Sequence, residues 1–170
     1  PAAVSALELA ADRVRKFQGR GLPKSWSDGT GKFGEKVTPL ETIAAYVPGR
    51  TAPLASTLIM TAVPAKVAGV DEIIVATPTP GKALPHPAIL AAAKIAGADR
   101  VFKLGGAQAI AALAYGTESV PAVDLICGPG SVWVTASKKL VFGDVGIDGL
   151  YGPTETLVIA DESANPCFTA

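Results

Sequence analysis

Short apolar runs alternate with helix-length segments along most of this chain, and this rhythm limits its fold more than any other feature. The strand-like runs fall at residues 41–47, 72–77, 101–104, 123–127 and 155–160. They are continuously apolar, which indicates strands that are buried on both faces. Helical crossovers between such strands favour a parallel arrangement covered by helices. The sequence therefore predicts an α/β fold, a Rossmann-like parallel sheet with helices on both faces.

The first forty residues have a different texture. In residues 1–18, apolar side chains recur at helical spacing and predict an amphipathic helix whose apolar face is Val4, Leu7, Ala11, Val14 and Phe17. Residues 19–39 are rich in Gly, Ser, Asp and Pro and have no apolar period. We expect a long irregular connection there, with Trp26 exposed.

Glycine-rich turns follow two of the predicted strands, "LGGAQ" at residues 104–108 and "CGPGS" at residues 127–131. In an open parallel sheet the ligand crevice lies at the carboxyl ends of the strands, so both turns are expected at one edge. A helix that begins beside such a turn presents free N–H groups to a phosphate. The two turns suit two parts of a dinucleotide, or a cofactor and a substrate, and the expected lining is Gly105, Gly106, Gly128 and Gly130. Tight strand-to-helix turns without a ligand are the alternative, because neither turn matches a known phosphate-binding motif.

Polar and aromatic side chains near the same edge have two interpretations each. Gln108 can donate to a ligand or cap its helix, and Tyr46 can stack on a ring or close the core. Ser131 and Thr154 can contact a ligand or serve as helix caps and turn hydroxyls. Carboxylates near these loops are expected to act as caps or solvated groups; they are Asp124, Asp148 and Glu155.

Composition excludes several classes of partner. Fifteen basic residues balance fifteen acidic ones in the 170 residues, so no overall field gathers nucleic acid or anionic lipid. No apolar stretch is long enough to span a membrane. Cys127 and Cys167 lie far apart and are expected to be reduced core thiols, which favours the cytoplasm or an organelle reached with a cleaved transit peptide.

Histidine, the commonest metal ligand, occurs once. His86 stands between two prolines, where we expect it to begin a helix. One histidine and two distant cysteines match no zinc-ligand spacing, so no metal site and no catalytic residue are predicted within the chain.

Long motifs make the chain resemble histidinol dehydrogenase. They are "YVPGRTAPLASTLIMTAVPAKVAGV" at 46–70 and "GGAQAIAALAYGTESVPAVDLICGPGSVWVTASKKLVFGDVGIDGLYGPTETLVIADESANP" at 105–166. The resemblance implies the NAD-dependent oxidation of L-histidinol to L-histidine through the aldehyde, in histidine biosynthesis. It also implies a zinc ion that holds the substrate, and a homodimer.

The resemblance also implies roles for particular residues. Tyr46 and Gln108 match NAD-contacting positions, and Ser131 stands where the family usually has an asparagine of its cofactor-binding turn. Thr154 stands where the family has a substrate-contacting serine. The bulkier Arg50 and Tyr151 replace small residues, and these exchanges leave a paralogous dehydrogenase for another amino or hydroxy alcohol as the alternative.

The end of the chain departs from the family pattern, because the family's zinc ligands and acid–base pair would follow the last residues. We therefore expect the N-terminal-to-middle part of such an enzyme, inactive by itself. Its expected division is an N-terminal helix and connection (1–40), an NAD-binding Rossmann-like domain (41–153) and the start of the return into a neighbouring domain (154–170). The alternative is a nucleotide-binding module without catalysis.

Overall fold

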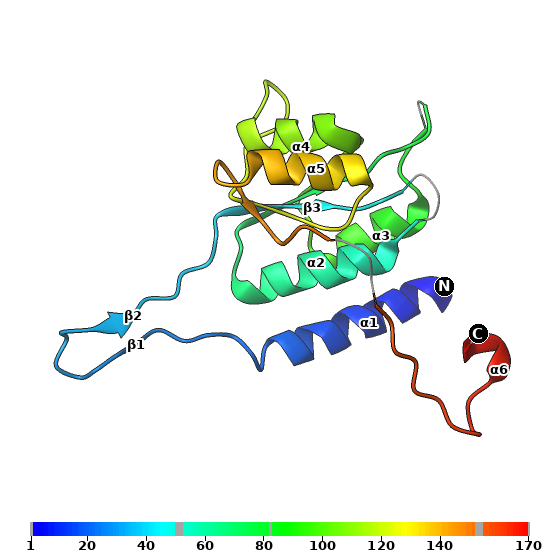
Figure 1. Ribbon diagram of the computed structural model, residues 1–170, viewed down its shortest axis with the longest axis horizontal. Coiled ribbons are helices and arrows are strands. Elements are labelled where there is room, and N and C mark those ends of the chain that lie inside the picture. The colour runs from blue at the N-terminus through cyan, green and yellow to red at the C-terminus, as the bar shows by residue number, and fades with distance from the viewer. Residues whose placement is uncertain (1, 50–52, 82, 152–154, 170) are drawn as a thin grey trace.

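The computed structural model describes residues 2–49, 53–81, 83–151 and 155–169 (Figure 1). Its elements in chain order are α1 (Ala2–Gln18), β1 (Trp26–Ser27), β2 (Gly34–Glu35), β3 (Thr42–Tyr46), α2 (Ala55–Ala68), β4 (Glu72–Ala76), α3 (Pro87–Ala96), β5 (Arg100–Phe102), α4 (Gly106–Tyr115), β6 (Leu125–Cys127), α5 (Val132–Val141), β7 (Gly146–Ile147) and α6 (Pro166–Thr169). None of the helices in these ranges is long and apolar enough to cross a membrane.

Five parallel strands form the central sheet, in the order β5-β4-β3-β6-β7. The first strand of this sheet, β3, lies in the middle, so that Ala45 pairs with Val75 on one side and with Cys127 on the other. The chain builds outward through β4 and β5, then crosses back to add β6 and β7. The strand order therefore reverses between β3 and β6, and the predicted parallel sheet is confirmed.

The fifth strand is not the predicted one. Residues 155–160 form no strand, and the side chains of Leu157 and Ile159 are 84% and 88% exposed. An apolar run becomes a strand only when a neighbouring strand satisfies its backbone groups, and the described residues provide none here. The sheet is completed by β7, which is too short for an apolar period to reveal it.

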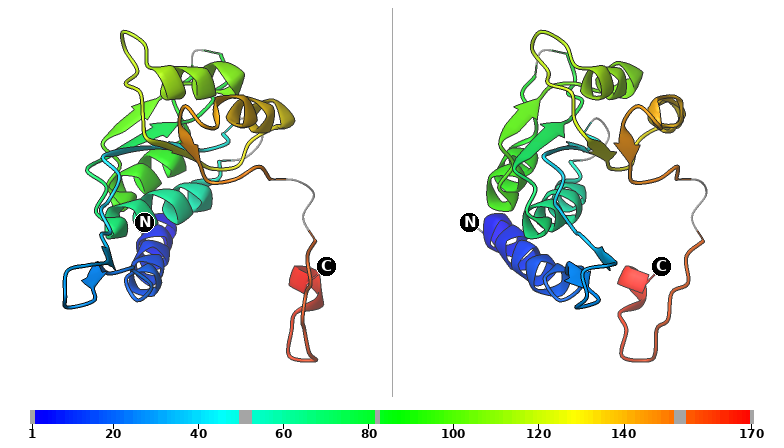
Figure 2. Two further views of the ribbon diagram at one scale, coloured as in Figure 1. Left: turned by 60° about the vertical axis from the view of Figure 1, so that its left-hand side comes forward. Right: turned by 90° about the vertical axis from the view of Figure 1, so that its left-hand side faces the viewer.

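Helices cover both faces of the sheet, as predicted. Figure 2 shows α2 and α3 on one face with α1 packed outside them, and α4 and α5 on the other. Strand β3 contributes to both layers, because Ile43 and Ala45 face α2 and α3 whereas Ala44 and Tyr46 face α4 and α5. Two apolar cores result, one on each side of a sheet that is buried on both faces.

The amphipathic α1 is confirmed, but its apolar face is used only in part. Ala11 is buried, and Leu7 and Val14 pack against the core beside it. Val4 and Phe17 remain exposed, Phe17 by 75%. The middle of the helix therefore makes the contacts that hold it to α2 and α3.

The prediction of an entirely irregular connection is wrong for residues 26–35. Strands β1 and β2 pair there as an antiparallel hairpin. Trp26 packs edge-on against Phe33, with ring centroids 6.1 Å apart, and its Nε1 donates to a Glu35 carboxylate oxygen at 3.1 Å. These side-chain contacts add to the backbone pairing of the hairpin, and its exposed strands lack the apolar alternation from which a strand is predicted. Trp26 is exposed, as expected.

Candidate functional site

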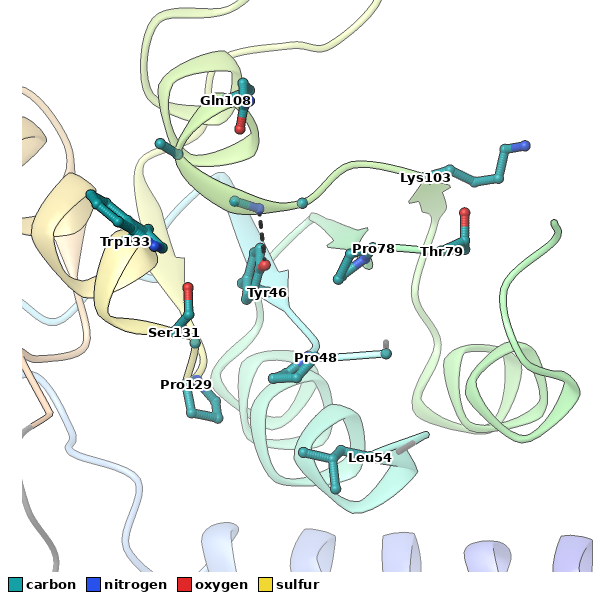
Figure 3. A pocket seen from close by; sticks show the side chains of 15 residues that line it. Tyr46, Pro48, Leu54, Pro78, Thr79, Lys103, Gln108, Pro129, Ser131 and Trp133 are labelled. Carbon is teal, nitrogen blue, oxygen red and sulfur yellow. Dashed lines mark hydrogen bonds between the residues drawn. The ribbon is translucent and has the colours of Figure 1, made fainter. Parts of the chain in front are cut away.

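A cavity of about 1080 Å³ lies at the carboxyl ends of the strands, where the strand order reverses (Figure 3). Both glycine-rich turns line it, as the sequence predicts. Its lining residues are Tyr46, Pro48, Gly49, Leu54, Pro78, Thr79, Lys103, Gly105, Gly106, Ala107, Gln108, Pro129, Gly130, Ser131 and Trp133. A crevice at this position is where open α/β sheets bind ligands.

Tyr46 ends β3 beneath the cavity. Its side chain is 4% exposed, and its hydroxyl accepts a hydrogen bond from the Gly106 N–H at 3.1 Å (Figure 3). One free N–H at the start of α4 is thereby satisfied by a side chain from the central strand. The ring of Tyr46 belongs to the core, as one interpretation expected, and it also lines the cavity. Stacking of Tyr46 on a ligand ring stays a prediction.

The start of α4 approaches its neighbours closely. A Cβ atom at Gly105 would come within 2.4 Å of the Pro78 Cβ, so a side chain here would collide with the turn that follows β4. Gly105 occupies the N-cap without a side-chain hydrogen bond. The exposed Gln108 side chain folds back towards Gly106, whose own Cβ would lie 2.9 Å from the Gln108 Oε1. The helix terminus therefore offers N–H groups and one amide to the cavity.

The start of α5 forms the opposite wall. Ser131 occupies the N-cap position, but its hydroxyl makes no capping hydrogen bond and the side chain is exposed. Gly130 packs against Val134, since a Cβ there would lie 2.4 Å from the Val134 Cγ1. Gly128, also predicted to line the edge, is absent from the lining and packs under it against the Tyr46 backbone.

Among the lining residues that were not predicted from the sequence, one carries a charge and one a large aromatic ring. Lys103 is exposed and lies at the edge of the cavity, with its ammonium group pointing away from Tyr46 and Ser131, and Trp133 presents an indole that is 73% exposed (Figure 3). A cation and an open aromatic face suit a phosphate and a flat ring, respectively. Lys103 directly follows β5 and Trp133 lies in the first turn of α5, and these positions at the carboxyl ends of strands could have identified both residues from the sequence.

A buried ion pair lies behind the second turn and was also missed. The side chain of Lys138 is 2% exposed and pairs with Asp148, which is 19% exposed. The sequence presented Lys138 as one of two adjacent lysines near a helix C-terminus, a pattern typical of a solvated surface. Only the fold brings the end of α5 beneath the turn at Gly128.

The remaining candidates lie elsewhere. Asp124 acts as a cap, as expected, and accepts hydrogen bonds from the backbone N–H groups of Glu41 and Thr42. His86 begins α3, with its Nδ1 accepting from the Ala88 N–H at 3.1 Å. Thr154 and Arg50 lie outside the described residues. Glu155 is exposed.

Metal-ligating side chains do not gather in the described part of the chain, where no three His, Cys, Asp or Glu residues lie close enough to hold an ion. The cavity is lined by glycine, proline, aliphatic, aromatic, hydroxyl and amide residues with one lysine, and by no His, Cys, Asp or Glu among the described residues. These side chains suit an organic anion better than a metal cation.

Both cysteines are free thiols, but only one is sheltered. Cys167 is exposed, which corrects the expectation that both lie in the core. Burial raises the pKa of the Cys127 thiol to about 11, and the Asp148 carboxylate adds to the increase. With this pKa, about one Cys127 side chain in a thousand is ionised at pH 8. The thiolate is the reactive form of cysteine, so Cys127 is expected to react slowly.

We therefore expect iodoacetamide at pH 8 to alkylate Cys127 at least about 100-fold more slowly than free cysteine. Peptide mass spectrometry over a time course measures the rate at each site. A Cys167→Ser variant serves as the control, because its one remaining thiol should react slowly throughout. Alkylation of Cys127 at the rate of free cysteine would contradict the structure.

A sheet in which the strand order reverses beside its first strand, with a cavity over the reversal and a helix starting on each side, defines an α/β protein of the Rossmann-like class. The sequence profile of the histidinol dehydrogenase family matches residues 1–170. The chain belongs to the histidinol dehydrogenase family.

Individual relatives agree with this assignment. Histidinol dehydrogenase from Thermus thermophilus is 57% identical over 167 residues, and that from Deinococcus radiodurans is 57% identical over 171 residues. The crystal structure of histidinol dehydrogenase from Elizabethkingia anophelis is similar with a TM-score of 0.86 at 38% identity, over 97% of this chain and 39% of that one. The first two matches include 97% and 98% of this chain, but this chain spans only 40% and 38% of the length of those relatives.

Proposed function

We propose that the chain is the NAD-binding part of a zinc-requiring histidinol dehydrogenase. The observation that carries the proposal is the convergence of Tyr46, Gln108 and Ser131 on one cavity from three separate segments. These are the positions that the resemblance assigned to NAD. Residues 41–153 are proposed as the NAD-binding domain, and residues 1–40 and 154–170 as parts of the neighbouring one.

The cavity fits a dinucleotide in its polar groups. The N-termini of α4 and α5 face it, and neither N-cap residue caps its helix through its own side chain. Apart from the Gly106 N–H, which Tyr46 satisfies, their N–H groups can stabilise the negative charge of a phosphate. Lys103 adds an exposed cation to the lining. Gln108 and Ser131 supply donors that no capping role occupies. When bound, NAD supplies the hydride acceptor for the oxidation of an alcohol or aldehyde.

Zinc does not fit the described residues, since His86 caps α3 and Asp148 neutralises Lys138. Its ligands, the proton acceptor and the contacts that complete a homodimer are proposed to lie in the part of the relatives beyond this match. The chain's own residues are proposed to bind and orient the cofactor, while the oxidation of L-histidinol requires the remainder.

Addition of NAD is the direct test. At about 100 times its dissociation constant, NAD should stabilise the 170-residue chain by about 2.7 kcal/mol, which raises the melting temperature by roughly 5–10 °C. Gln108→Ala should remove one hydrogen bond and weaken binding about tenfold, so that the stabilisation at the same NAD concentration falls by about half. Differential scanning fluorimetry measures both.

Gln18→Ala is the matched control, because Gln18 is also exposed but lies at the end of α1. It should leave the NAD-dependent shift unchanged. Production of NADH from L-histidinol should stay at background even with zinc supplied, since positioning without a proton acceptor leaves the hydroxyl proton in place. A well-folded chain with no shift would favour a module that does not bind NAD, and robust turnover would show that the catalytic groups lie within these residues.

A further inference from the structure

The peptide groups of Gly128 are held on both sides by charged side chains. Its N–H donates to the Asp148 Oδ2 at 2.6 Å, and its carbonyl oxygen accepts from the Lys138 Nζ at 3.1 Å. Lys138 and Asp148 also pair with each other, through the other carboxylate oxygen. The ion pair and the glycine backbone therefore form one closed network.

This network costs free energy to bury. Lys138 is almost completely inaccessible at 2% exposure, and desolvation of an ammonium group is unfavourable by several kcal/mol before its partners are counted. An apolar residue of similar length, such as methionine, would fill the same space without that penalty. A contribution to stability alone therefore does not explain a lysine at this position. Fixing the Gly128 backbone does explain it, because this requires a donor for the carbonyl oxygen and an acceptor for the N–H group.

The turn is also confined from the opposite direction. A Cβ at Gly128 would lie 2.1 Å from the Tyr46 carbonyl oxygen, so the turn is pressed against the end of β3. Pro129, Gly130 and Ser131 follow directly and line the cavity. Movement of the Gly128 peptide would carry these three residues, and the start of α5, with it.

Tyr151 closes the network on its outer side. Its hydroxyl donates to the Asp148 Oδ2 at 2.8 Å, and the Lys138 Nζ lies 5.3 Å from the centre of its ring. The hydrogen bond to Asp148 raises the pKa of Tyr151 to about 12, so the phenol keeps its donor proton at neutral pH. The carboxylate is thus held by two donors besides the ammonium group.

We infer that Lys138 and Asp148 are positioning residues, which hold the turn at residues 128–131 in the geometry that faces the cavity and thereby set the affinity for NAD. Neither side chain lines the cavity among the described residues, so both act through the Gly128 backbone. The inference rests on the proposed NAD-binding function. It deepens that function by identifying two residues beneath the cavity lining that set the geometry of the NAD site.

The test compares NAD affinity with stability in the 170-residue chain. Isothermal titration with NAD, below the unfolding transition, should give a dissociation constant about 10- to 100-fold higher for Lys138→Met and for Asp148→Ala, as a displaced binding group produces. The double variant Lys138→Met/Asp148→Asn has no unpaired buried charge. It should regain most of the thermal stability and still bind NAD weakly, an outcome that a merely structural role does not give.

Amide hydrogen exchange follows the backbone itself. In 15N-edited NMR spectra without NAD, the Gly128 amide proton should lose its protection from exchange in Asp148→Ala. Asp148→Asn keeps one acceptor oxygen and should restore part of that protection and part of the NAD affinity. Lys139→Met and Asp144→Asn are the matched controls: Lys139 is the exposed neighbour in α5, and Asp144 accepts the Tyr115 hydroxyl in an equivalent bond. Neither should change affinity or protection.

The outcomes separate the two proposals. Wild-type binding that the variants retain, or a double variant that regains affinity together with stability, would overturn the positioning role and leave the NAD site intact. A folded wild-type chain that binds no NAD would contradict the proposed function and its control by Lys138 and Asp148 together. Unchanged protection of the Gly128 amide in Asp148→Ala would show that the network does not hold the turn.

Discussion

Gly128→Ala is expected to lower the free energy of unfolding by about 3 kcal/mol or more. Its φ of 113° lies in the region that side-chain-bearing residues rarely adopt, which costs about 1–3 kcal/mol. The new Cβ would also meet the Tyr46 carbonyl oxygen at 2.1 Å, and relief of such a contact requires backbone shifts that cost about 1–3 kcal/mol more. Urea denaturation followed by circular dichroism measures the loss.

Gly143→Ala separates the two causes. Gly143 has a nearly identical φ of 110°, but nothing lies within 4 Å of an added Cβ. It should therefore show the conformational cost alone, about 1–3 kcal/mol. An equal loss in the two variants would mean that the close approach of the turn to β3 carries no penalty, against the geometry of the structure.

Asp148→Asn is expected to destabilise the chain by about 3 kcal/mol, because it leaves the Lys138 ammonium group buried without a counter-charge. Lys138→Met in the same chain removes that charge. The double variant should therefore be more stable than Asp148→Asn alone, which gives a large coupling energy in a double-mutant cycle. Thermal and urea unfolding of the four proteins provide the cycle.

An exposed pair provides the comparison. Lys16 and Asp12 form an i,i+4 ion pair on α1 with a distance of 2.8 Å and largely solvated side chains. Its double-mutant cycle should give a coupling energy below about 1 kcal/mol. Additive effects of Lys138→Met and Asp148→Asn would mean that water reaches the pair in solution.

Much of the sheet was predictable because each of its four longer strands is a compact apolar run. β3 and β4 are buried along most of their length, so their residues carry the pattern in full. The run at 155–160 has the same pattern but is exposed and forms no strand, because an apolar pattern cannot report whether a neighbouring strand is present to pair with it and cover it. β7 has two residues, which is too few for any period.

The position of the cavity could be predicted from a topological rule, but the residues that hold its lining in place could not. Gly105, Gly106 and Gly130 could be placed at one edge because they come directly after strands. Gly128 was expected to have the same role, yet it serves as the packing point beneath the lining. Lys138 and Asp148 were hidden because their contact depends on how α5 turns into β7, and no periodicity encodes that geometry.

The central position of β3 has a consequence for the order in which the chain can fold. Its pairing of Ile43 with Ile73 closes a short loop, and the core between the sheet and α2 and α3 needs little beyond residue 96. Its pairing of Ile43 with Leu125 must wait for a much longer loop to close. During synthesis one face of the sheet can therefore be buried while the other is still being made. The cavity draws on both halves, so it cannot form before β6 docks, and a nascent chain acquires its candidate ligand site only after that step.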